Sequence, residues 1–161
     1  MTVKDFTIFL DLDGTLKTEV DLTPPFEVET LNVQSGTRSY NIGVRPNLIE
    51  FLDYAKSKAS LALSTASGRR YARSVVNEMG IYHYFDHFYT IESFNVGIPF
   101  FSNCIFIDNH EDAGMQKMDK MAKPNYGVSV VRNDLWTIDT YFGTKDDTTM
   151  LDLIKELKDL A

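Results

Sequence analysis

Three short apolar runs in this sequence each end in polar side chains, and this pattern constrains the fold more than any other feature. The runs cover residues 5–12, 60–65 and 104–108. Their length and their content of Ile, Phe and Leu are typical of buried strands. Segments with helical periodicity separate them, which predicts a mainly parallel sheet with helices on both faces. The polar residues at the three ends are Asp11, Asp13, Ser64, Thr65, Asp108 and Asn109.

The rest of the chain continues this alternation. Two period-two segments, 26–33 and 38–44, flank the turn sequence QSGT and predict a β-hairpin. Further strands are expected at 87–91 and 127–131, and loops at 17–25 and 92–103. Helices are expected at 46–58, 69–80 and 147–160. The first should bury Leu48, Phe51, Leu52 and Ala55, and the last Met150, Leu151, Ile154 and Leu157.

These elements predict the α/β fold class, as a three-layer α/β/α arrangement around a mainly parallel, Rossmann-like sheet. We expect one domain over residues 1–161, with the hairpin as a small flap at about 26–44. A length of 161 residues, 43% of them hydrophobic and 24% charged, is typical of one globular domain.

Charge and cysteine content limit the classes of partner and compartment. The net charge of −7 makes nucleic acid an unlikely partner. The single cysteine, Cys104, excludes an intramolecular disulfide, is expected to be inert and indicates a reducing, intracellular location. We therefore expect a cytoplasmic protein, with the nucleus left open. No membrane partner is expected, because no apolar segment approaches the ~20 residues of a span.

The two carboxylates at the end of the first strand repel each other unless a cation lies among them. Mg²⁺ prefers oxygen ligands and commonly binds one or two carboxylates with waters and a phosphate. Asp11 can then present a nucleophilic oxygen, and Asp13 can act at the same centre as a general acid and base. Thr65 can offer its hydroxyl and its backbone N–H to a phosphate. Taken alone, the two aspartates could instead close a turn through their own backbone.

Four stretches resemble the haloacid dehalogenase superfamily of phosphohydrolases. They are FLDLDGTL (9–16), VRPNLIEFL (44–52), LALSTASGRRYA (61–72) and IFIDNHEDA (105–113). The match is closer to one branch, the Ser/Thr phosphatases of the RNA polymerase II C-terminal-domain and NLI-interacting-factor-like type. The hairpin before VRPNLIEFL resembles the flap of that branch.

This resemblance implies a role for each matching residue. Asp11 would form an aspartyl-phosphate, Asp13 would be the general acid and base, and Thr65 would hold the phosphoryl group. Magnesium would bind Asp11, the carbonyl of Asp13, Asp108 and Asn109. The expected phosphate-binding set is Leu12, Thr65, Ala66 and Arg70.

One family element is missing from its usual place. The family has a lysine in the segment before the last apolar run, where it pairs with the nucleophile and the phosphate. Residues 89–109 contain no Lys or Arg, so Arg69 and Arg70 are the nearest substitutes. We expect Lys117, Lys120 and Lys123 to lie on a solvent-exposed face.

The short insertions at 17–44 and 92–103 leave no room for a large cap domain, so we expect an open site. Such a site suits phosphorylated Ser or Thr of a protein, or another large phosphoester. Two alternatives remain: a phosphatase of small metabolites or nucleotides, and a binding module that has lost turnover. The oligomeric state is not predicted.

Overall fold

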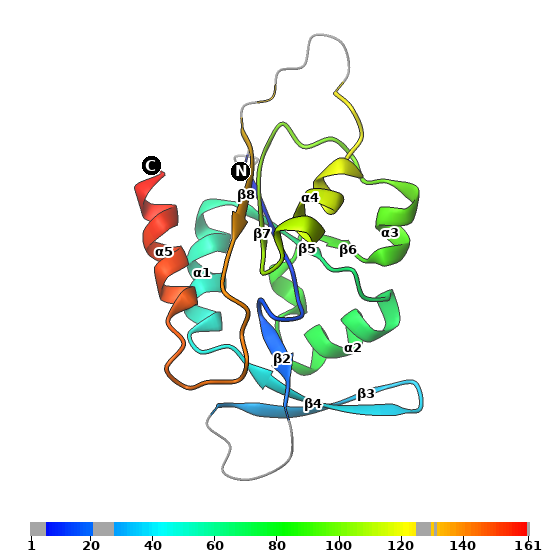
Figure 1. Ribbon diagram of the computed structural model, residues 1–161, viewed down its shortest axis with the longest axis vertical. Helices are drawn as coiled ribbons and strands as arrows, with labels where there is room; N and C mark the ends of the chain where they lie inside the picture. The colour runs from blue at the N-terminus through cyan, green and yellow to red at the C-terminus, as the bar shows by residue number, and fades with distance from the viewer. Residues whose placement is uncertain (1–5, 21–27, 125–129, 131, 161) are drawn as a thin grey trace.

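A five-stranded parallel sheet forms the centre of the computed structural model, which describes residues 6–20, 28–124, 130 and 132–160. The strand order is β6-β5-β1-β7-β8, and all four neighbouring pairs are parallel. Figure 1 shows these strands between the helices. The strands are β1 (Thr7–Leu10), β5 (Ser60–Ser64), β6 (His87–Tyr89), β7 (Asn103–Asp108) and β8 (Arg132–Thr137).

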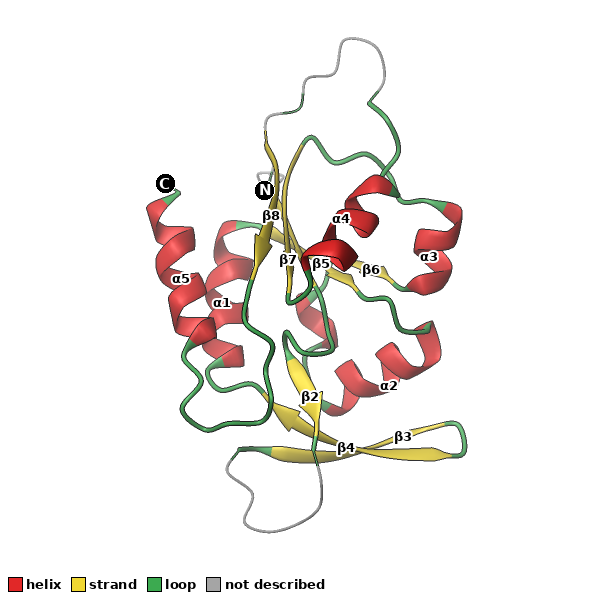
Figure 2. Cartoon of the chain, viewed as in Figure 1, coloured by secondary structure: helices red, strands yellow, loops and turns green. Residues whose placement is uncertain are grey.

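Helices cover both faces of the sheet. Successive side chains of a strand point to opposite faces, and all four residues of β1 are buried, so both faces need a covering layer. Ile8 and Leu10 lie in a core cluster with residues of α1, α2 and α5, whereas Phe9 lies in a second cluster with Phe94 of α3. Figure 2 shows α1 and α5 on one side and α3 and α4 on the other. The helices are α1 (Leu48–Lys58), α2 (Arg69–Glu78), η1 (Tyr82–Tyr84, a 3₁₀ turn), α3 (Ile91–Val96), α4 (Glu111–Asp119) and α5 (Thr149–Asp159). The predicted three-layer α/β fold is confirmed.

The predicted hairpin forms, and a third strand joins it. β3 (Thr30–Ser35) and β4 (Arg38–Val44) pair antiparallel around a turn in which Gly36 has a φ of 64°. β2 (Lys17–Glu19) pairs antiparallel with β4, so the start of the predicted loop at 17–25 is a strand. Three residues carry too little periodicity to reveal a strand, and the neighbouring strand supplies its hydrogen bonds. Residues 21–27 lie outside the described part of the chain.

The predicted loop at 92–103 is wrong at its beginning, where α3 forms. The Thr90 hydroxyl accepts from the backbone of Ser93, and the Ser93 hydroxyl accepts from the backbone N–H of Thr90. This reciprocal cap satisfies two N–H groups that a short helix would otherwise leave unpaired. Ile91, which we assigned to the preceding strand, is the first residue of α3.

Two predicted elements lie near the C-terminus. The strand predicted at 127–131 falls outside the described residues except for Val130, which is exposed and not in a strand. The following strand, β8, was not predicted, because it begins with the polar sequence Arg-Asn-Asp and lacks a hydrophobic pattern there. In α5, Met150 and Leu157 are buried as predicted, but Leu153 is buried while Leu151 is 37% exposed.

Arg45 joins three segments that are distant in the sequence. It is 1% exposed, and its guanidinium forms a bidentate pair with Asp147 at 2.8 and 2.9 Å. It also donates to the backbone carbonyls of Thr15 (3.1 Å) and Asp139 (2.9 Å) and to the hydroxyl of Thr149 (2.8 Å). The turn after β1, the end of β4 and the beginning of α5 are therefore held by one planar group.

Replacing Arg45 should destabilise the fold strongly. Arg45→Met should lower the free energy of unfolding by about 3–5 kcal/mol, because a carboxylate and several carbonyls lose their donor. Urea unfolding followed by circular dichroism measures the change. Arg38→Met, at an exposed position of β4, is the control and should cost less than about 0.5 kcal/mol. Equal losses in the two variants would contradict the role of Arg45.

Candidate functional site

The carboxyl ends of three neighbouring strands bring most of the predicted site residues together. β1 is hydrogen-bonded to β5 on one side and to β7 on the other, and Leu10 lies level with Leu63 and Ile107. The residues that follow therefore meet at one edge of the sheet. Asp11, Thr65, Asp108 and Asn109 are all buried there.

Lys117 of α4 binds the carboxyl ends of all three strands at this edge. Its ammonium group donates to Asp11 Oδ1 (2.9 Å), to Asp108 Oδ2 (2.6 Å) and to the backbone carbonyl of Ser64 (2.7 Å). A lysine has three N–H donors, and each is used by the end of a different strand. We predicted Lys117 on a solvent-exposed face, which is wrong: the residue is 5% exposed.

A glycine one turn earlier explains how the Lys117 side chain reaches the site. Gly114 and Lys117 lie three residues apart, on the same face of α4. A Cβ at Gly114 would lie 2.5 Å from Cδ1 of Leu135 in β8 and 3.4 Å from Cβ of Asp108. The missing side chain therefore lets the helix approach the sheet closely. This buried glycine is the sequence signal that identifies the inward face of α4.

The two buried carboxylates each turn their second oxygen toward Asn109. The side-chain oxygen of Asn109 lies 2.8 Å from Asp11 Oδ2, 3.3 Å from Asp108 Oδ1 and 3.1 Å from the backbone carbonyl oxygen of Asp13. The Thr140 hydroxyl lies 3.1 Å from the other end of the Asn109 amide, where it can accept from the nitrogen or donate to the oxygen, so this contact suits either orientation of the amide. With the amide rotated, its nitrogen would donate to the same three oxygens, which is the arrangement expected without a cation.

These four oxygens fit a magnesium ion. Mg²⁺ binds oxygens at 2.0–2.1 Å in an octahedron, so neighbouring ligand oxygens are about 2.9 Å apart. Among the described residues, no group of three or more His, Cys, Asp or Glu side chains could hold a metal. The candidate set is instead mixed: the carboxylates of Asp11 and Asp108, the amide oxygen of Asn109 and the carbonyl of Asp13.

The environment of Asp11 makes ionisation of its carboxyl less favourable than in water. Burial raises the pKa of its carboxyl from 3.8 to about 6, against the lowering effect of Lys117, and the charge of Asp108 raises it further. The Thr15 hydroxyl donates to Asp11 Oδ2 at 3.0 Å. One lysine therefore does not fully compensate two buried carboxylates, and a divalent cation would complete the compensation.

The side chain of Asp13 faces away from the four oxygens. It is half exposed, forms an ion pair with the fully buried Lys17, and lies 3.4 Å from the Tyr71 hydroxyl. Lys17 also donates to the Tyr71 hydroxyl. Burial raises the pKa of Tyr71, so its hydroxyl keeps its proton and can donate to Asp13. No sequence pattern indicated either partner of Asp13, since one is the first residue of β2 and the other lies in α2.

Backbone N–H groups near Asp11 provide donors for an anion. Within the described residues, the N–H groups of Leu12 and Ala66 have no hydrogen-bond acceptor, and Leu12 is fully buried. A buried N–H without a partner is uncommon in folded proteins. We expected the N–H of Thr65 to bind phosphate, but it donates to the carbonyl of Tyr89 (3.1 Å). The Thr65 hydroxyl bonds to the Ser67 hydroxyl at 2.7 Å.

The structure does not bring Arg70 to these groups. It is exposed on α2, and its guanidinium lies beside the hairpin turn, 3.7 Å from where a Cβ of Gly36 would be. Arg70 therefore does not lie at its predicted place in the phosphate site. Lys117 is the basic residue that contacts Asp11.

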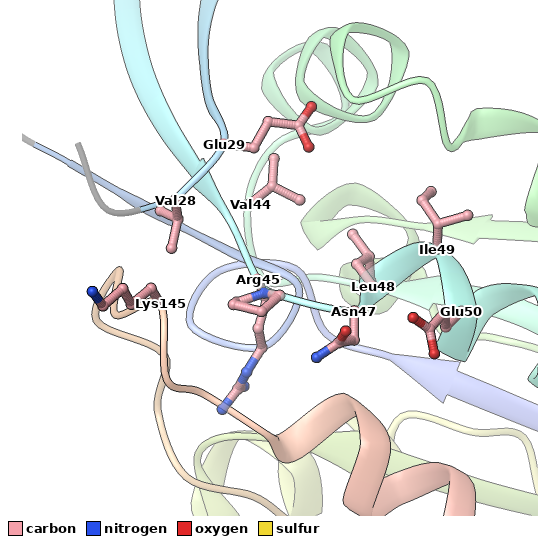
Figure 3. A pocket seen from close by; sticks show the side chains of 10 residues that line it. Val28, Glu29, Val44, Arg45, Asn47, Leu48, Ile49, Glu50 and Lys145 are labelled. Atoms are coloured by element: carbon pink, nitrogen blue, oxygen red, sulfur yellow. The ribbon is translucent and has the colours of Figure 1, made fainter.

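A groove of about 440 Å³ at the beginning of α1 does not belong to this site. Figure 3 shows that Glu29 and Glu50 flank it, while the side chain of Arg45 points away toward the beginning of α5. Two carboxylates against Lys145 make it unsuited to a phosphoester, and no residue of the Asp11 cluster lines it. We assign it no part in the chemistry.

Comparison with family models identifies the family of this chain. The model for the NLI interacting factor-like phosphatases matches residues 6–161. The chain belongs to this phosphatase family. No curated protein matches it in sequence. The resemblance expected from the four sequence stretches is confirmed.

Solved structures share the fold of this family member at low identity. Two structures of the RNA polymerase II CTD phosphatase Fcp1, one from fission yeast bound to beryllium fluoride, are 16% and 17% identical, each with a TM-score of 0.54. Both alignments cover 96% of this chain but only 50% of the Fcp1 chain. A Had-superfamily hydrolase from Ehrlichia chaffeensis is 13% identical, with a TM-score of 0.54, and the alignment covers 99% and 98% of the two chains.

Two further expectations concern residues outside the site. Burial raises the pKa of the Cys104 thiol to about 11, so the thiol keeps its proton at neutral pH, as expected of an inert residue. None of the helices in the described residues has the length and apolar character needed to cross a membrane.

Removing the charge of Asp11 should stabilise the metal-free protein above pH 6. The carboxyl ionises near pH 3.8 in the unfolded chain but near pH 6 in the fold, so the wild type loses stability as the pH rises between these values. Asp11→Asn has no such loss and should be more stable by about 2–3 kcal/mol at pH 7, and by much less at pH 4. Thermal or urea unfolding in EDTA measures the difference. A variant less stable than wild type at pH 7 would contradict this account of Asp11.

Proposed function

We propose that the protein is a Mg²⁺-dependent phosphomonoester hydrolase that works through an aspartyl-phosphate on Asp11 and acts on phosphorylated Ser or Thr of proteins. The observation that carries the proposal is the contact of Lys117 with Asp11 and Asp108, beside four converging oxygens. Family membership supports the reaction class.

The first half of the reaction transfers the phosphoryl group to the enzyme. An oxygen of the Asp11 carboxylate attacks phosphorus, and the bond from phosphorus to the substrate oxygen breaks. Lys117 keeps Asp11 ionised and oriented, and it stabilises charge on the transferring group. The N–H groups of Leu12 and Ala66, which have no acceptor among the described residues, would donate to phosphoryl oxygens, and the Thr65 hydroxyl would support the same turn.

Asp13 supplies and removes protons in this scheme. Its carboxyl gives a proton to the departing substrate oxygen, and its carboxylate then takes a proton from the water that attacks phosphorus. The second attack breaks the bond to Asp11 and releases inorganic phosphate. To act this way, the Asp13 side chain must turn from Lys17 and Tyr71 toward the phosphoryl group, while its backbone carbonyl stays beside Asn109.

Magnesium would be held by Asp11, the Asp13 carbonyl, Asp108 and Asn109. When bound, the ion would neutralise charge on the nucleophile and on the phosphoryl oxygens, so that two anions can approach each other. Thr140 and Thr15 orient two of these ligands through hydrogen bonds.

The proposed substrate class rests on the small size of the insertions. Among the described residues, only the β2-β4-β3 sheet and α3 occupy the places where a cap could enclose a small molecule. A site without an enclosing cap admits a side chain on a large substrate. The fission yeast relative, an RNA polymerase II CTD phosphatase, is consistent with this class.

Substitution of the two aspartates tests the mechanism. Asp11→Asn should abolish turnover of a phosphoserine peptide, and Asp13→Asn should lower kcat by ~10²–10⁴-fold. Phosphate release measured with and without Mg²⁺ gives the values. Asp159→Asn, an exposed carboxylate at the end of α5, is the control. Activity of Asp11→Asn within tenfold of wild type would exclude it as the nucleophile, and turnover of free nucleotides or phosphosugars but not of peptides would exclude the proposed substrate class.

Lys117→Met tests whether the lysine of α4, rather than an arginine of α2, supports phosphoryl transfer. Loss of a buried charge beside the phosphoryl group should lower kcat by ~10²–10³-fold. Lys123→Met removes an exposed lysine beyond α4 and should leave kcat unchanged. Circular dichroism of both variants controls for folding. Full activity in a folded Lys117→Met variant would show that the contact of Lys117 with Asp11 is structural only.

A further inference from the structure

Three arginines gather on one side of α2, outside the proposed catalytic cluster. Arg69, Arg70 and Arg73 line a groove of about 550 Å³ together with Ser74, Asn77 and Glu92. Residues three and four apart are neighbours on a helix surface, so Arg73 lies beside both Arg70 and Arg69. All three arginines are exposed.

The charges of this groove are largely uncompensated. Within the described part of the chain, none of the three guanidinium groups forms an ion pair, whereas Arg45 and Arg132 each pair with an aspartate. Glu92 is the one carboxylate in the groove, and it accepts from the backbone N–H of Arg69 at 3.0 and 3.2 Å. These bonds and the Thr90 hydroxyl lower the pKa of Glu92, so it stays ionised. Three positive charges against one negative charge leave the groove basic.

The positive charge of this groove is opposite in sign to the net charge of the chain. The chain carries a net charge of −7, which repels acidic molecules at long range. Exposed charges more than about 8–10 Å apart are screened at physiological ionic strength. The arginines therefore attract an anion only over a short range, and a substrate bound at Asp11 would bring its own acidic groups within that range.

The groove lies close in sequence to the proposed phosphate site. Thr65 and Ala66 precede α2 by a few residues, and Arg69 is the first residue of that helix. Four residues of chain span at most about 14 Å, and one helical turn from Arg69 to Arg73 adds about 6 Å. An extended peptide of about six residues covers this distance of 20 Å or less.

We propose that this groove binds a second acidic group of the substrate peptide, a phosphoserine, aspartate or glutamate up to six residues from the phosphoserine being hydrolysed. The inference rests on the proposed function and deepens it, because it names the kind of phosphopeptide that the site prefers. Planar guanidinium groups bind carboxylates and phosphates through paired hydrogen bonds. The catalytic cluster would bind the reacting phosphate, and the groove would select its neighbours.

Binding to a variant that does not turn over tests the groove independently of the chemistry. Fluorescence anisotropy with Asp11→Asn compares two labelled peptides that share one phosphoserine, one with neutral flanks and one with aspartates at positions two to six from it. The acidic peptide should bind about tenfold more tightly at 50 mM salt, and the preference should shrink at 300 mM. Adding Arg73→Gln to this variant should remove most of the preference, and Arg69→Gln should reduce it.

Lys155→Gln is the matched control, because it removes one exposed positive charge on α5. It should keep the preference for the acidic peptide. In parallel, kcat/KM of the otherwise wild-type protein should show the same preference, and Arg73→Gln should reduce it through KM.

Different failures have different meanings. Equal binding of the two peptides, or a preference that survives Arg69→Gln and Arg73→Gln, would overturn the groove proposal even if the enzyme hydrolyses both. Absence of turnover, with a preference that depends on these arginines, would contradict the proposed function and leave the groove as a binding site. Arginine-dependent binding of a 5′-phosphorylated oligonucleotide in preference to either peptide would overturn the assignment of the groove to peptides.

Discussion

The arrangement of the site depends on one buried ammonium group. Parallel strands bring their carboxyl ends to the same edge, and here that edge carries two carboxylates with little access to water. Such a pair is unstable without positive charge nearby. Lys117 supplies it, and its third hydrogen bond to Ser64 ties β5 to the same point. The position of α4 relative to the sheet, and therefore the need for a glycine at 114, follows from the requirement that this lysine reach the three strand ends.

A second buried cation contacts the other side of the turn that follows β1. Arg45 donates to the carbonyls of Gly14 and Thr15, whereas Lys117 contacts Asp11. The turn from Asp11 to Thr15 thus lies between two fixed positive groups that belong to different parts of the chain. This arrangement sets the backbone before any substrate arrives, which is what a site needs if it is to stabilise charge without rearranging. Asp13, whose side chain contacts Lys17 and Tyr71, is the half-exposed carboxylate of this turn.

Sequence patterns predicted those parts of the fold whose signals are local. The residues of α1 that face the core all followed from a 3.6-residue period, and the strand ends that carry Asp11, Thr65 and Asp108 followed from short apolar runs. The missed elements lack such signals: β2 depends on β4 for its hydrogen bonds, α3 on a reciprocal cap in six residues, and β8 begins with three polar residues. Lys117 was misplaced for a related reason. A lysine is normally exposed, and the partner that buries this one, Asp11, is 106 residues away.

The order of the site residues along the chain has a consequence for assembly. Asp108 and Lys117 are only nine residues apart, at the two ends of a single strand-to-helix connection. Asp11, the proposed nucleophile, and the turn at Thr65 belong to the first half of the sequence. A chain divided between α3 and β7 would thus yield one piece with an uncompensated anion and another with the counter-charge and the remaining oxygen ligands. Neither piece alone could hold phosphate as we propose. Activity recovered on mixing the two pieces would therefore measure how well β1 and β7 pair with each other.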